Sequence, residues 1–381
     1  MSRSYRSRLR PLAAAAIGIA LLGGAIPAAS ALGGETGCEV RNLTNPNGVS
    51  SDLTVAIAAA SGGETIEVRG TCTGGTWSPI ASPGILTVVG KRTTALGRPT
   101  ITAAAANQPV IVVNGSPAVT IRGLRITGAS GSIARGGGIR LDSGTLRLDS
   151  VRIDGITATV IDGGGIFAVF GTTIVLSKTT RITGTSAETG GGIYAQTGVT
   201  ITMRDRATID HTSADWGGAI IMAPTAVLTM RDRSSIHHAS ATGGGGAIGG
   251  DDGVAITLRD DASLHHNTAG GYGTAINSGG TIVLRDRASV HDNAIDGPGI
   301  PDAGGFGSAI DLWRYGTDPT TLTIRDAATV RANTALAGGA GILLWTACGL
   351  GNDPVVTGAK RTRVFGNSPK NVVRYDSTAG C

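Results

Sequence analysis

Residues 190–220 read GGGIYAQTGVTITMRDRATIDHTSADWGGAI and contain one full period of an internal repeat. The period opens on a triplet of small residues followed by isoleucine. This element recurs after 27 or 28 residues, with its isoleucines at Ile139, Ile166, Ile193, Ile220 and Ile248. It continues at Ile276, Ile310 and Ile342, where longer gaps indicate loop insertions around 296–306 and 315–320. A fixed period of this size predicts a solenoid.

Two further elements of each period alternate apolar with polar residues, as in Ile201-Thr202-Met203 and Ala207-Thr208-Ile209. Such alternation is typical of strands, so we expect three short strands per period. Stacked coils then bring equivalent residues into register, because a coil cannot bury its inward side chains alone. The first expected column is Met203, Met230, Leu258, Leu284 and Ile324, and the second is Ile209, Ile236, Leu264, Val290 and Val330. The fold class predicted is all-β, a single-stranded right-handed parallel β-helix solenoid.

We expect one domain over residues 32–381, with regular repeats over about 136–345 and caps over about 32–64 and 346–381. In the first cap, Ser51-Asp52 leads into Leu53, Ile57 and Ala60, which predicts a short amphipathic helix over the open end of the core. Further strands are expected at 65–68, 85–89, 110–113 and 119–126.

The N-terminus resembles a secretory signal peptide. Four arginines precede an apolar stretch from Leu12 to about Ile26, and Ala29-Ser30-Ala31 forms a cleavage signature. We therefore predict a signal peptide over 1–31, and expect no membrane span elsewhere. Because the chain has 32 basic and 27 acidic side chains, losing four arginines leaves it nearly neutral. We expect no nucleic-acid partner.

Four cysteines are an even number, as in an exported chain where disulfides persist. Three connectivities are open. Pairing Cys38 with Cys72 and Cys348 with Cys381 would pin the two ends of the structure.

These elements resemble those of right-handed β-helix proteins of the pectin-lyase-like superfamily, especially polymorphic outer membrane protein repeats. Those repeats pair an element such as Gly217-Gly218-Ala219-Ile220 with an apolar-x-x-Asn element such as Val290-His291-Asp292-Asn293. The resemblance covers nearly all of the mature chain and implies the fold more than the function. Autotransported members carry a C-terminal membrane barrel, whereas the sequence here stops at Cys381 soon after the last repeat. We therefore expect a freely secreted or cell-surface-associated protein.

Polysaccharide cleavage is the main enzymatic alternative. Inverting glycosidases need two carboxylates with space for a water between them, and Asp251 and Asp252 are the candidate catalytic pair. The resemblance to polygalacturonases is partial, because their Asn-Thr-Asp, Gly-His-Gly and Arg-Ile-Lys segments do not occur. A solvated turn is the simpler interpretation of this acidic pair.

An Arg-Asp pair repeats in successive coils, as at Arg204-Asp205 and Arg231-Asp232. Calcium-dependent pectate lyases use clustered carboxylates and an arginine, so a lyase site has to be considered. A catalytic site would be irregular, however. The regular repetition favours a structural corner at which opposite charges neutralise each other, with little stability from each exposed pair.

All six histidines fall in one part of the repeat. Strand alternation is expected to stack His237, His265 and His291 beyond Asp210, and to stack His211, His238 and His266 before Asp292. The second column, His211, His238, His266 and Asp292, is the candidate metal site. Polar turn positions that tolerate histidine are the competing interpretation. We expect no cofactor, with Zn²⁺ or Ca²⁺ as the ions that the candidate residues would accept.

Aromatic residues make up only 3% of the chain, which argues against a long sugar-stacking platform. Trp313, Arg314 and Tyr315 lie where the period lengthens, and they are the candidate binding residues, with Trp216 and Trp345 as neighbours from other coils. A packed loop anchor is the alternative.

Because no complete catalytic motif is present, we expect a secreted, monomeric, non-catalytic interaction protein of the adhesin-like kind. Its expected partner is an extracellular carbohydrate or a surface protein. The alternative function is that of a polysaccharide lyase or glycoside hydrolase acting on acidic polysaccharide such as pectin.

Overall fold

A computed structural model describes residues 37–45, 49–78, 84–115, 118–297, 307–313, 319–336, 339, 341–346, 354–360 and 363–376. These residues belong to one compact unit, Thr36–Cys381. The predicted signal peptide, Arg314, Tyr315, Cys348 and Cys381 lie outside the described residues.

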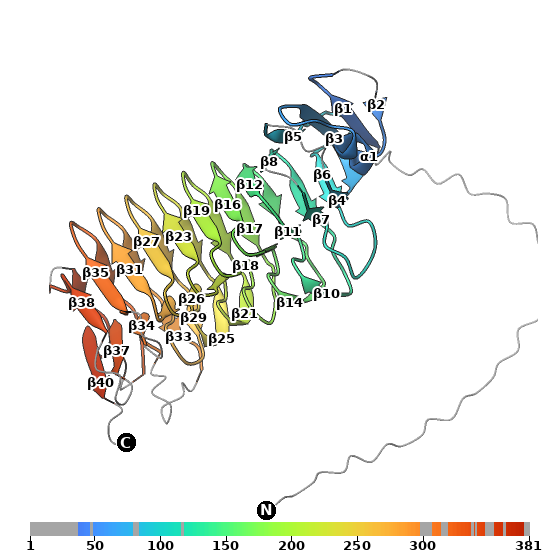
Figure 1. The fold of residues 1–381 in the computed structure, drawn as a ribbon. Coiled ribbons are helices and arrows are strands. Elements are labelled where there is room, and N and C mark those ends of the chain that lie inside the picture. The colour runs from blue at the N-terminus through green and yellow to red at the C-terminus, as the bar shows by residue number, and fades with distance from the viewer. Residues whose placement is uncertain are drawn as a thin grey trace, which may run out of the picture. The chain divides into compact units, whose positions relative to one another are not determined.

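The chain forms a parallel β-solenoid, which confirms the predicted fold class (Figure 1). Its first sheet takes one strand from each coil, and the isoleucine of the repeat starts most of these strands. The strands are β4 (Gly75–Trp77), β7 (Ile111–Val113), β11 (Ile139–Leu141), β15 (Ile166–Ala168), β18 (Ile193–Ala195), β22 (Ile220–Met222), β26 (Ile248–Gly250), β30 (Ile276–Ser278), β34 (Ile310–Leu312), β37 (Ile342–Thr346) and β40 (Val372–Asp376).

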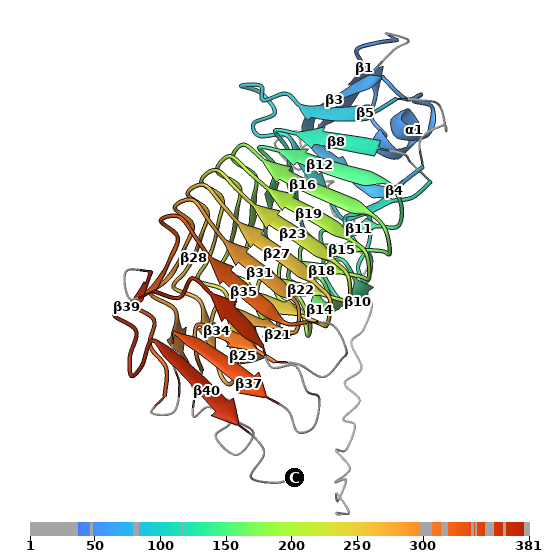
Figure 2. The same cartoon turned by 60° about the vertical axis from the view of Figure 1, so that its left-hand side comes forward.

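The second series of strands carries the longest apolar alternation of each coil, and Figure 2 shows these strands side by side in sequence order. The strands are β5 (Leu86–Gly90), β8 (Ala118–Arg122), β12 (Thr145–Asp149), β16 (Thr173–Ser177), β19 (Thr200–Met203), β23 (Val227–Met230), β27 (Ala255–Leu258), β31 (Thr281–Leu284), β35 (Thr321–Ile324) and β38 (Val355–Thr357).

In each coil, a strand of the third series follows the strand of the second series after a tight corner. Its strands are β6 (Thr100–Thr102), β9 (Arg125–Thr127), β13 (Arg152–Ile153), β17 (Arg181–Thr183), β20 (Thr208–Asp210), β24 (Ser235–His237), β28 (Ser263–His265), β32 (Ser289–His291), β36 (Thr329–Arg331) and β39 (Val364–Phe365).

Some coils have a fourth short strand, which the sequence pattern did not predict. These strands are β10 (Ser132–Arg135), β14 (Thr159–Asp162), β21 (Ser213–Trp216), β25 (Ser240–Gly244), β29 (Thr268–Ala269) and β33 (Ala294–Ile295). Because they are short and largely polar, they give little alternation to detect.

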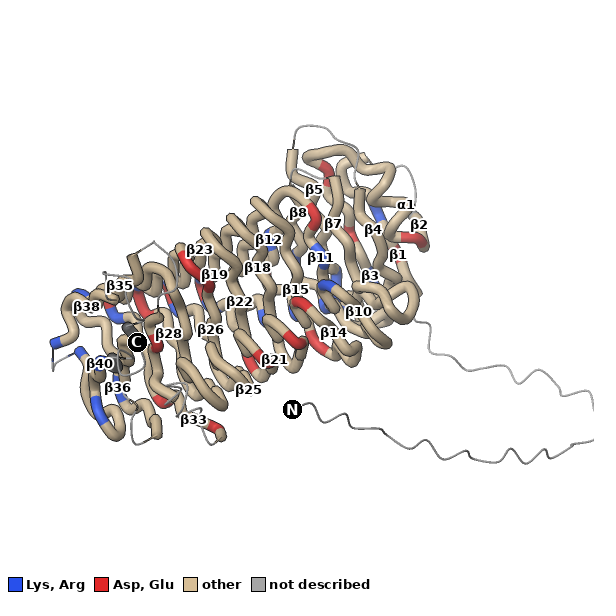
Figure 3. Tube along the Cα trace, turned by 60° about the horizontal axis from the view of Figure 1, so that its bottom comes forward, with Lys and Arg blue, Asp and Glu red and all other residues tan. Residues whose placement is uncertain are grey.

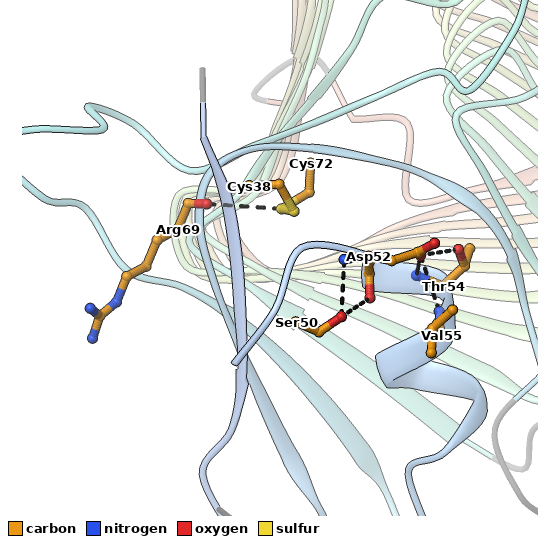
Figure 4. The surroundings of a disulfide bond; sticks show 7 residues. All are labelled: Cys38, Ser50, Asp52, Thr54, Val55, Arg69 and Cys72. Carbon is orange, nitrogen blue, oxygen red and sulfur yellow. Dashed lines mark hydrogen bonds between the residues drawn. A yellow bond between two sulfur atoms is a disulfide. The ribbon is translucent and has the colours of Figure 1, made fainter. Parts of the chain in front are cut away.

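The N-terminal cap has the predicted helix. Strand β1 (Cys38–Asn42) pairs antiparallel with β2 (Val49–Ser50) and with β3 (Thr65–Thr73), and α1 (Leu53–Ala58) buries Leu53 and Ile57. The Asp52 carboxylate caps α1 by accepting hydrogen bonds from the backbone N–H groups of Thr54 and Val55 at 2.9 and 3.1 Å. A disulfide joins Cys38 to Cys72 beside this cap (Figure 4), which confirms one of the two predicted bridges.

Both predicted core columns are confirmed. Met203 pairs in register with Met230, and the series continues to Ile324, while Ile209 pairs with Ile236 and its series continues to Val330. All ten side chains are buried, so each coil completes the core of its neighbours.

The glycine triplets allow successive coils to approach closely. A Cβ atom on Gly191 would lie 2.4 Å from the carbonyl oxygen of Gly218 on the next coil. Gly217 has a φ of +62°, which is in the left-handed region that favours glycine. The triplet is therefore required by backbone packing, not by side-chain chemistry.

Charged residues lie both on strands and at corners, and most of the chain trace is uncharged, including β22 and β26 (Figure 3). At one corner the aspartates of the Arg-Asp pairs adopt a left-handed conformation, as at Asp232 with φ +58°. The Asp232 carboxylate accepts a hydrogen bond at 3.0 Å from the backbone N–H of Asp205 on the preceding coil. This bond recurs along the stack, so the regular Arg-Asp pattern serves the fold. No helix within the described ranges is long and apolar enough to cross a membrane.

Candidate functional site

A cavity of about 400 Å³ opens on the outer side of the first sheet. Strands β18 to β37 supply its floor, and the segments flanking them supply its walls. Its described lining residues are Thr189, Tyr194, Trp216, Ile221, Gly249, Gly250, Asp251, Tyr272, Asn277, Asp311, Leu312, Trp313, Leu343 and Trp345.

The floor of the cavity is one outward-facing column of the sheet. In each strand the isoleucine points into the core and the next residue points outward, and register pairs Ile221, Gly249, Asn277, Asp311 and Leu343 in this order. Gly249 has no side chain in this column, and a Cβ atom there would lie 2.6 Å from Cδ1 of Ile221. Glycine at this position therefore lets the Ile221 side chain lie over the adjacent strand.

One wall consists of stacked aromatic rings. The rings of Trp216 and Tyr272 lie 6.1 Å apart with an interplanar angle of 19°, and Trp345 lies 6.3 Å from Tyr272. Trp216 and Tyr272 come from coils on either side of Gly244. A Cβ atom on Gly244 would lie 2.9 Å from both Cζ3 of Trp216 and Cβ of Tyr272. Glycine at this position therefore allows the two rings to stack across the intervening coil.

Trp313 folds back over the preceding coil. Its indole N–H donates a hydrogen bond to Oδ1 of Asn277. A Cβ atom on Gly279 would lie 2.8 Å from Cζ3 of Trp313 and 2.5 Å from Oδ1 of Asp252. The ring therefore rests on a glycine beside Asp252, and its position is fixed by both packing and a hydrogen bond.

Two carboxyl groups of the cavity have perturbed acidity. Asp311 is 4% exposed, and its burial raises its pKa to about 7 although Ser308 and the backbone N–H of Gly273 donate hydrogen bonds to it. Asp251 lies at the rim, where solvent reaches it on one side and protein atoms surround it on the other. This partial burial, followed by the charge of Asp252, raises the pKa of Asp251.

The described lining of the cavity includes no lysine, arginine or histidine. Its polar groups are carboxyl, amide and hydroxyl groups, and its aromatic groups are two tyrosines and three tryptophans. An uncharged ligand fits this environment better than an anionic one, because a negative charge would face carboxylates without a compensating cation.

The structure brings together several residues that the sequence had singled out separately. Asp251, Trp216, Trp313 and Trp345 line one cavity, and Asp252 lies against its edge. Sequence reasoning missed five polar or aromatic residues of the same cavity: Thr189, Tyr194, Tyr272, Asn277 and Asp311. Three of these directly follow the isoleucine of the repeat, so aligning the periods would have placed them in one outward column.

The histidines form the two predicted columns. Asp210, His237, His265 and His291 pair in register along the third series of strands. In the other column, the rings of His211, His238 and His266 stack with centroid distances of 5.0 and 5.2 Å. No group of three or more His, Cys, Asp or Glu side chains among the described residues is arranged to hold a metal ion. The column of His211, His238, His266 and Asp292 therefore gains no support as a shared metal site.

Asp210 anchors one end of these columns. Burial alone would raise the pKa of this carboxyl, but hydrogen bonds from Arg181, Thr183 and His211 outweigh burial and lower the pKa to about 2. In the middle of its column, His265 is desolvated and surrounded by other imidazoles, which lowers its pKa to about 4.

Comparison with protein-family models, with curated proteins and with solved structures finds no match for this chain. The class of protein that the fold and the cavity define is therefore a parallel β-solenoid with an aromatic cavity on one sheet.

Proposed function

We propose that this protein is a secreted β-helix that binds a neutral polysaccharide in the cavity on its first sheet. The observation that carries this proposal is the gathering of five aromatic rings in one cavity of a chain in which aromatic residues make up only 3%. Aromatic rings present a broad apolar face, which suits the C–H faces of sugar rings. Asn277, Asp251 and Asp311 supply hydrogen-bonding groups for sugar hydroxyls, as in a pocket with few and fixed polar groups.

The absence of a cation from the described lining favours a neutral glycan over pectin. A uronate chain carries one carboxylate per sugar and would be repelled by Asp251 and Asp252. We therefore favour glucans, mannans or xylans as ligands.

Secretion and family membership are parts of the same proposal. The N-terminal signal sequence and the cysteine usage support export. The paired Gly-Gly-Ala-Ile and apolar-x-x-Asn elements support a place among polymorphic outer membrane protein repeats of the pectin-lyase-like superfamily. An exported solenoid with a glycan cavity would act as an adhesin-like interaction protein.

Calorimetric titration tests glycan binding. Neutral oligosaccharides of each class and oligogalacturonates are titrated into wild-type protein, the Trp313→Ala variant and the Phe170→Ala variant. Phe170 is 69% exposed and is not among the lining residues of the cavity, so it is the matched aromatic control. We expect a neutral glycan to bind wild type and Phe170→Ala equally, and Trp313→Ala at least tenfold more weakly. Equal loss in both variants, or binding of oligogalacturonates alone, would contradict the proposal.

Hydrolysis of the bound glycan is the second candidate function, favoured by the raised pKa values of Asp251 and Asp311 on the same cavity. Asp311 would donate its proton to the glycosidic oxygen as the C–O bond breaks, and Asp251 would accept a proton from the water that attacks the anomeric carbon. The two residues belong to coils two apart, which separates their backbones by at least about 9.6 Å. The distance between the two carboxyl groups would distinguish an inverting from a retaining mechanism.

New reducing ends distinguish hydrolysis from binding. A hydrolase would release them from the neutral glycan, and both Asp251→Asn and Asp311→Asn would lose this activity while still binding the glycan. If wild type binds the glycan and releases no reducing ends, the protein is a binding protein only.

A further inference from the structure

In each of four coils, the residue of the first histidine column contacts the next residue of the chain, which belongs to the second column. In each pair the Nδ1 atom of a histidine meets either the Nδ1 atom of the neighbouring histidine or a carboxylate oxygen of the neighbouring aspartate, and the pair forms one rung per coil. The four rungs are Asp210–His211, His237–His238, His265–His266 and His291–Asp292, with contact distances of 2.8, 2.9, 2.9 and 2.7 Å. The two middle rungs contain only imidazoles.

A left-handed residue creates each rung. His211, His238, His266 and Asp292 have φ between +51° and +54°, and this conformation turns the second side chain of the rung back toward the first. The rings within a middle rung are nearly perpendicular, with an interplanar angle of 85° for His237 and His238.

Stacked imidazoles of one column are less suited to sharing one ion, because successive rings are spaced by about one interstrand step. Metal–nitrogen bonds of about 2.0–2.1 Å allow two nitrogens to lie at most about 4.2 Å apart on one ion. The stacked rings of His238 and His266 lie 5.2 Å apart, and those of His237 and His265 lie 5.0 Å apart. Within a rung, by contrast, the Nδ1 atoms lie 2.9 Å apart.

We infer that the His237–His238 and His265–His266 rungs are chelating sites for divalent transition-metal ions, each rung holding one ion through its two Nδ1 atoms. Two nitrogens 2.9 Å apart, each about 2.05 Å from the metal, subtend an angle of about 90° at the ion. This angle matches the tetragonal geometry of Cu²⁺ and Ni²⁺, which imidazole also suits. Zn²⁺ prefers a tetrahedral angle and should bind more weakly.

The outer rungs are poorer sites. The Asp210 carboxylate already accepts two hydrogen bonds of 2.6 Å from Arg181 and one of 2.7 Å from Thr183. His211 therefore has no second donor available for a metal, although its side chain is 60% exposed. The His291–Asp292 rung pairs one imidazole with one carboxylate, whereas Cu²⁺ and Ni²⁺ are better suited by a pair of imidazoles.

Titration of Ni²⁺ and Cu²⁺ into untagged protein tests this inference independently of glycan binding. We expect two ions per chain, the second at least tenfold weaker because two dications about 5 Å apart repel each other. His238→Asn should remove one site and His238→Asn combined with His266→Asn should remove both, since asparagine tolerates the left-handed backbone and lacks the imidazole. His211→Asn, with the same backbone conformation, is the matched control and should bind as wild type does.

Electron paramagnetic resonance of the wild-type protein with one equivalent of Cu²⁺ requires no variant to fold. The expected spectrum has two equatorial imidazole nitrogens. A single nitrogen per Cu²⁺, an equal loss of binding in His211→Asn, or no binding at millimolar Ni²⁺ would overturn the inference.

Discussion

The indole N–H of Trp313 donates a hydrogen bond to Oδ1 of Asn277 on the preceding coil. This bond joins a wall residue of the cavity to its floor. Asn277 is 7% exposed, so its side chain is fixed before any ligand arrives, and it fixes the indole ring in turn.

Asn277→Ala should therefore weaken glycan binding without abolishing it. The variant removes the acceptor of the Trp313 indole but leaves the ring, so we expect a loss of affinity of about threefold to tenfold, or about 1 kcal/mol. The loss for Trp313→Ala should be larger. Calorimetric titration with the neutral glycan measures both losses of affinity. If Asn277→Ala binds the glycan more weakly than Trp313→Ala does, Asn277 does not act mainly by holding the indole ring.

Gly244→Ala should disturb the aromatic wall. The added Cβ atom would lie 2.9 Å from Cζ3 of Trp216 and from Cβ of Tyr272, closer than packed atoms tolerate. We expect the Trp216 ring to move, the Trp216–Tyr272 stack to open and glycan affinity to fall at least fivefold. Gly37→Ala is the control, because Gly37 is not in the left-handed region and its added Cβ would meet only Cδ2 of Leu96, at an ordinary distance of 3.5 Å. Unchanged binding in Gly244→Ala would show that the stack is not part of the glycan site.

Asp311 should make the protein less stable as the pH rises. Its folded-state pKa is about 7, well above the unfolded value of 3.8, so the folded state binds the proton more tightly. The contribution of Asp311 to the free energy of unfolding should be largest below pH 4. It should decrease by about 1.4 kcal/mol per pH unit toward pH 7 and then level off.

Asp311→Asn provides the measurement for this pH dependence. The amide resembles the protonated carboxyl, so the variant should be as stable as wild type at pH 3.5, below the unfolded pKa, and more stable than wild type at pH 8. Urea denaturation at both pH values compares the two proteins. Parallel pH profiles would show that Asp311 does not titrate in this range.

Asn293→Ala should destabilise the stack of coils. The buried Asn293 side chain accepts hydrogen bonds of 3.0 and 2.9 Å from the backbone and side chain of Asn267, and it donates one of 3.1 Å to the carbonyl of Leu264. Removing it leaves buried polar groups without partners, which should cost about 2–4 kcal/mol. Chemical denaturation followed by circular dichroism measures the loss, and Asn45→Ala, at an exposed position, should leave stability unchanged.

Most of the solenoid could be predicted from the sequence because its repeat imposes one register on every coil. The columns from Met203 to Ile324 and from Ile209 to Val330 follow directly from the spacing of the small-residue triplets. The helix at Leu53–Ala58 could be predicted from its N-cap and apolar spacing.

The cavity could be predicted only in part. The sequence singled out four of its residues one by one: Asp251, Trp216, Trp313 and Trp345. That they line one cavity depends on how the Trp216 and Trp313 rings lie over Gly244 and Gly279. The raised pKa of Asp311 depends on its burial by neighbouring coils, and no short sequence pattern indicates such burial. The histidine columns followed from register, whereas the rungs depend on left-handed backbone conformations at His238 and His266.

Tryptophan fluorescence during glycan titration shows whether the aromatic cavity itself holds the glycan. Three of the four tryptophans line the cavity, and the fourth, Trp77, is fully buried in the early coil that contains β4. We predict that a neutral oligosaccharide produces a saturable fluorescence change and protects the cavity tryptophans from acrylamide quenching, whereas oligogalacturonate at the same concentration does neither. A response to oligogalacturonate alone, or glycan binding that leaves the cavity tryptophans open to acrylamide, would contradict it.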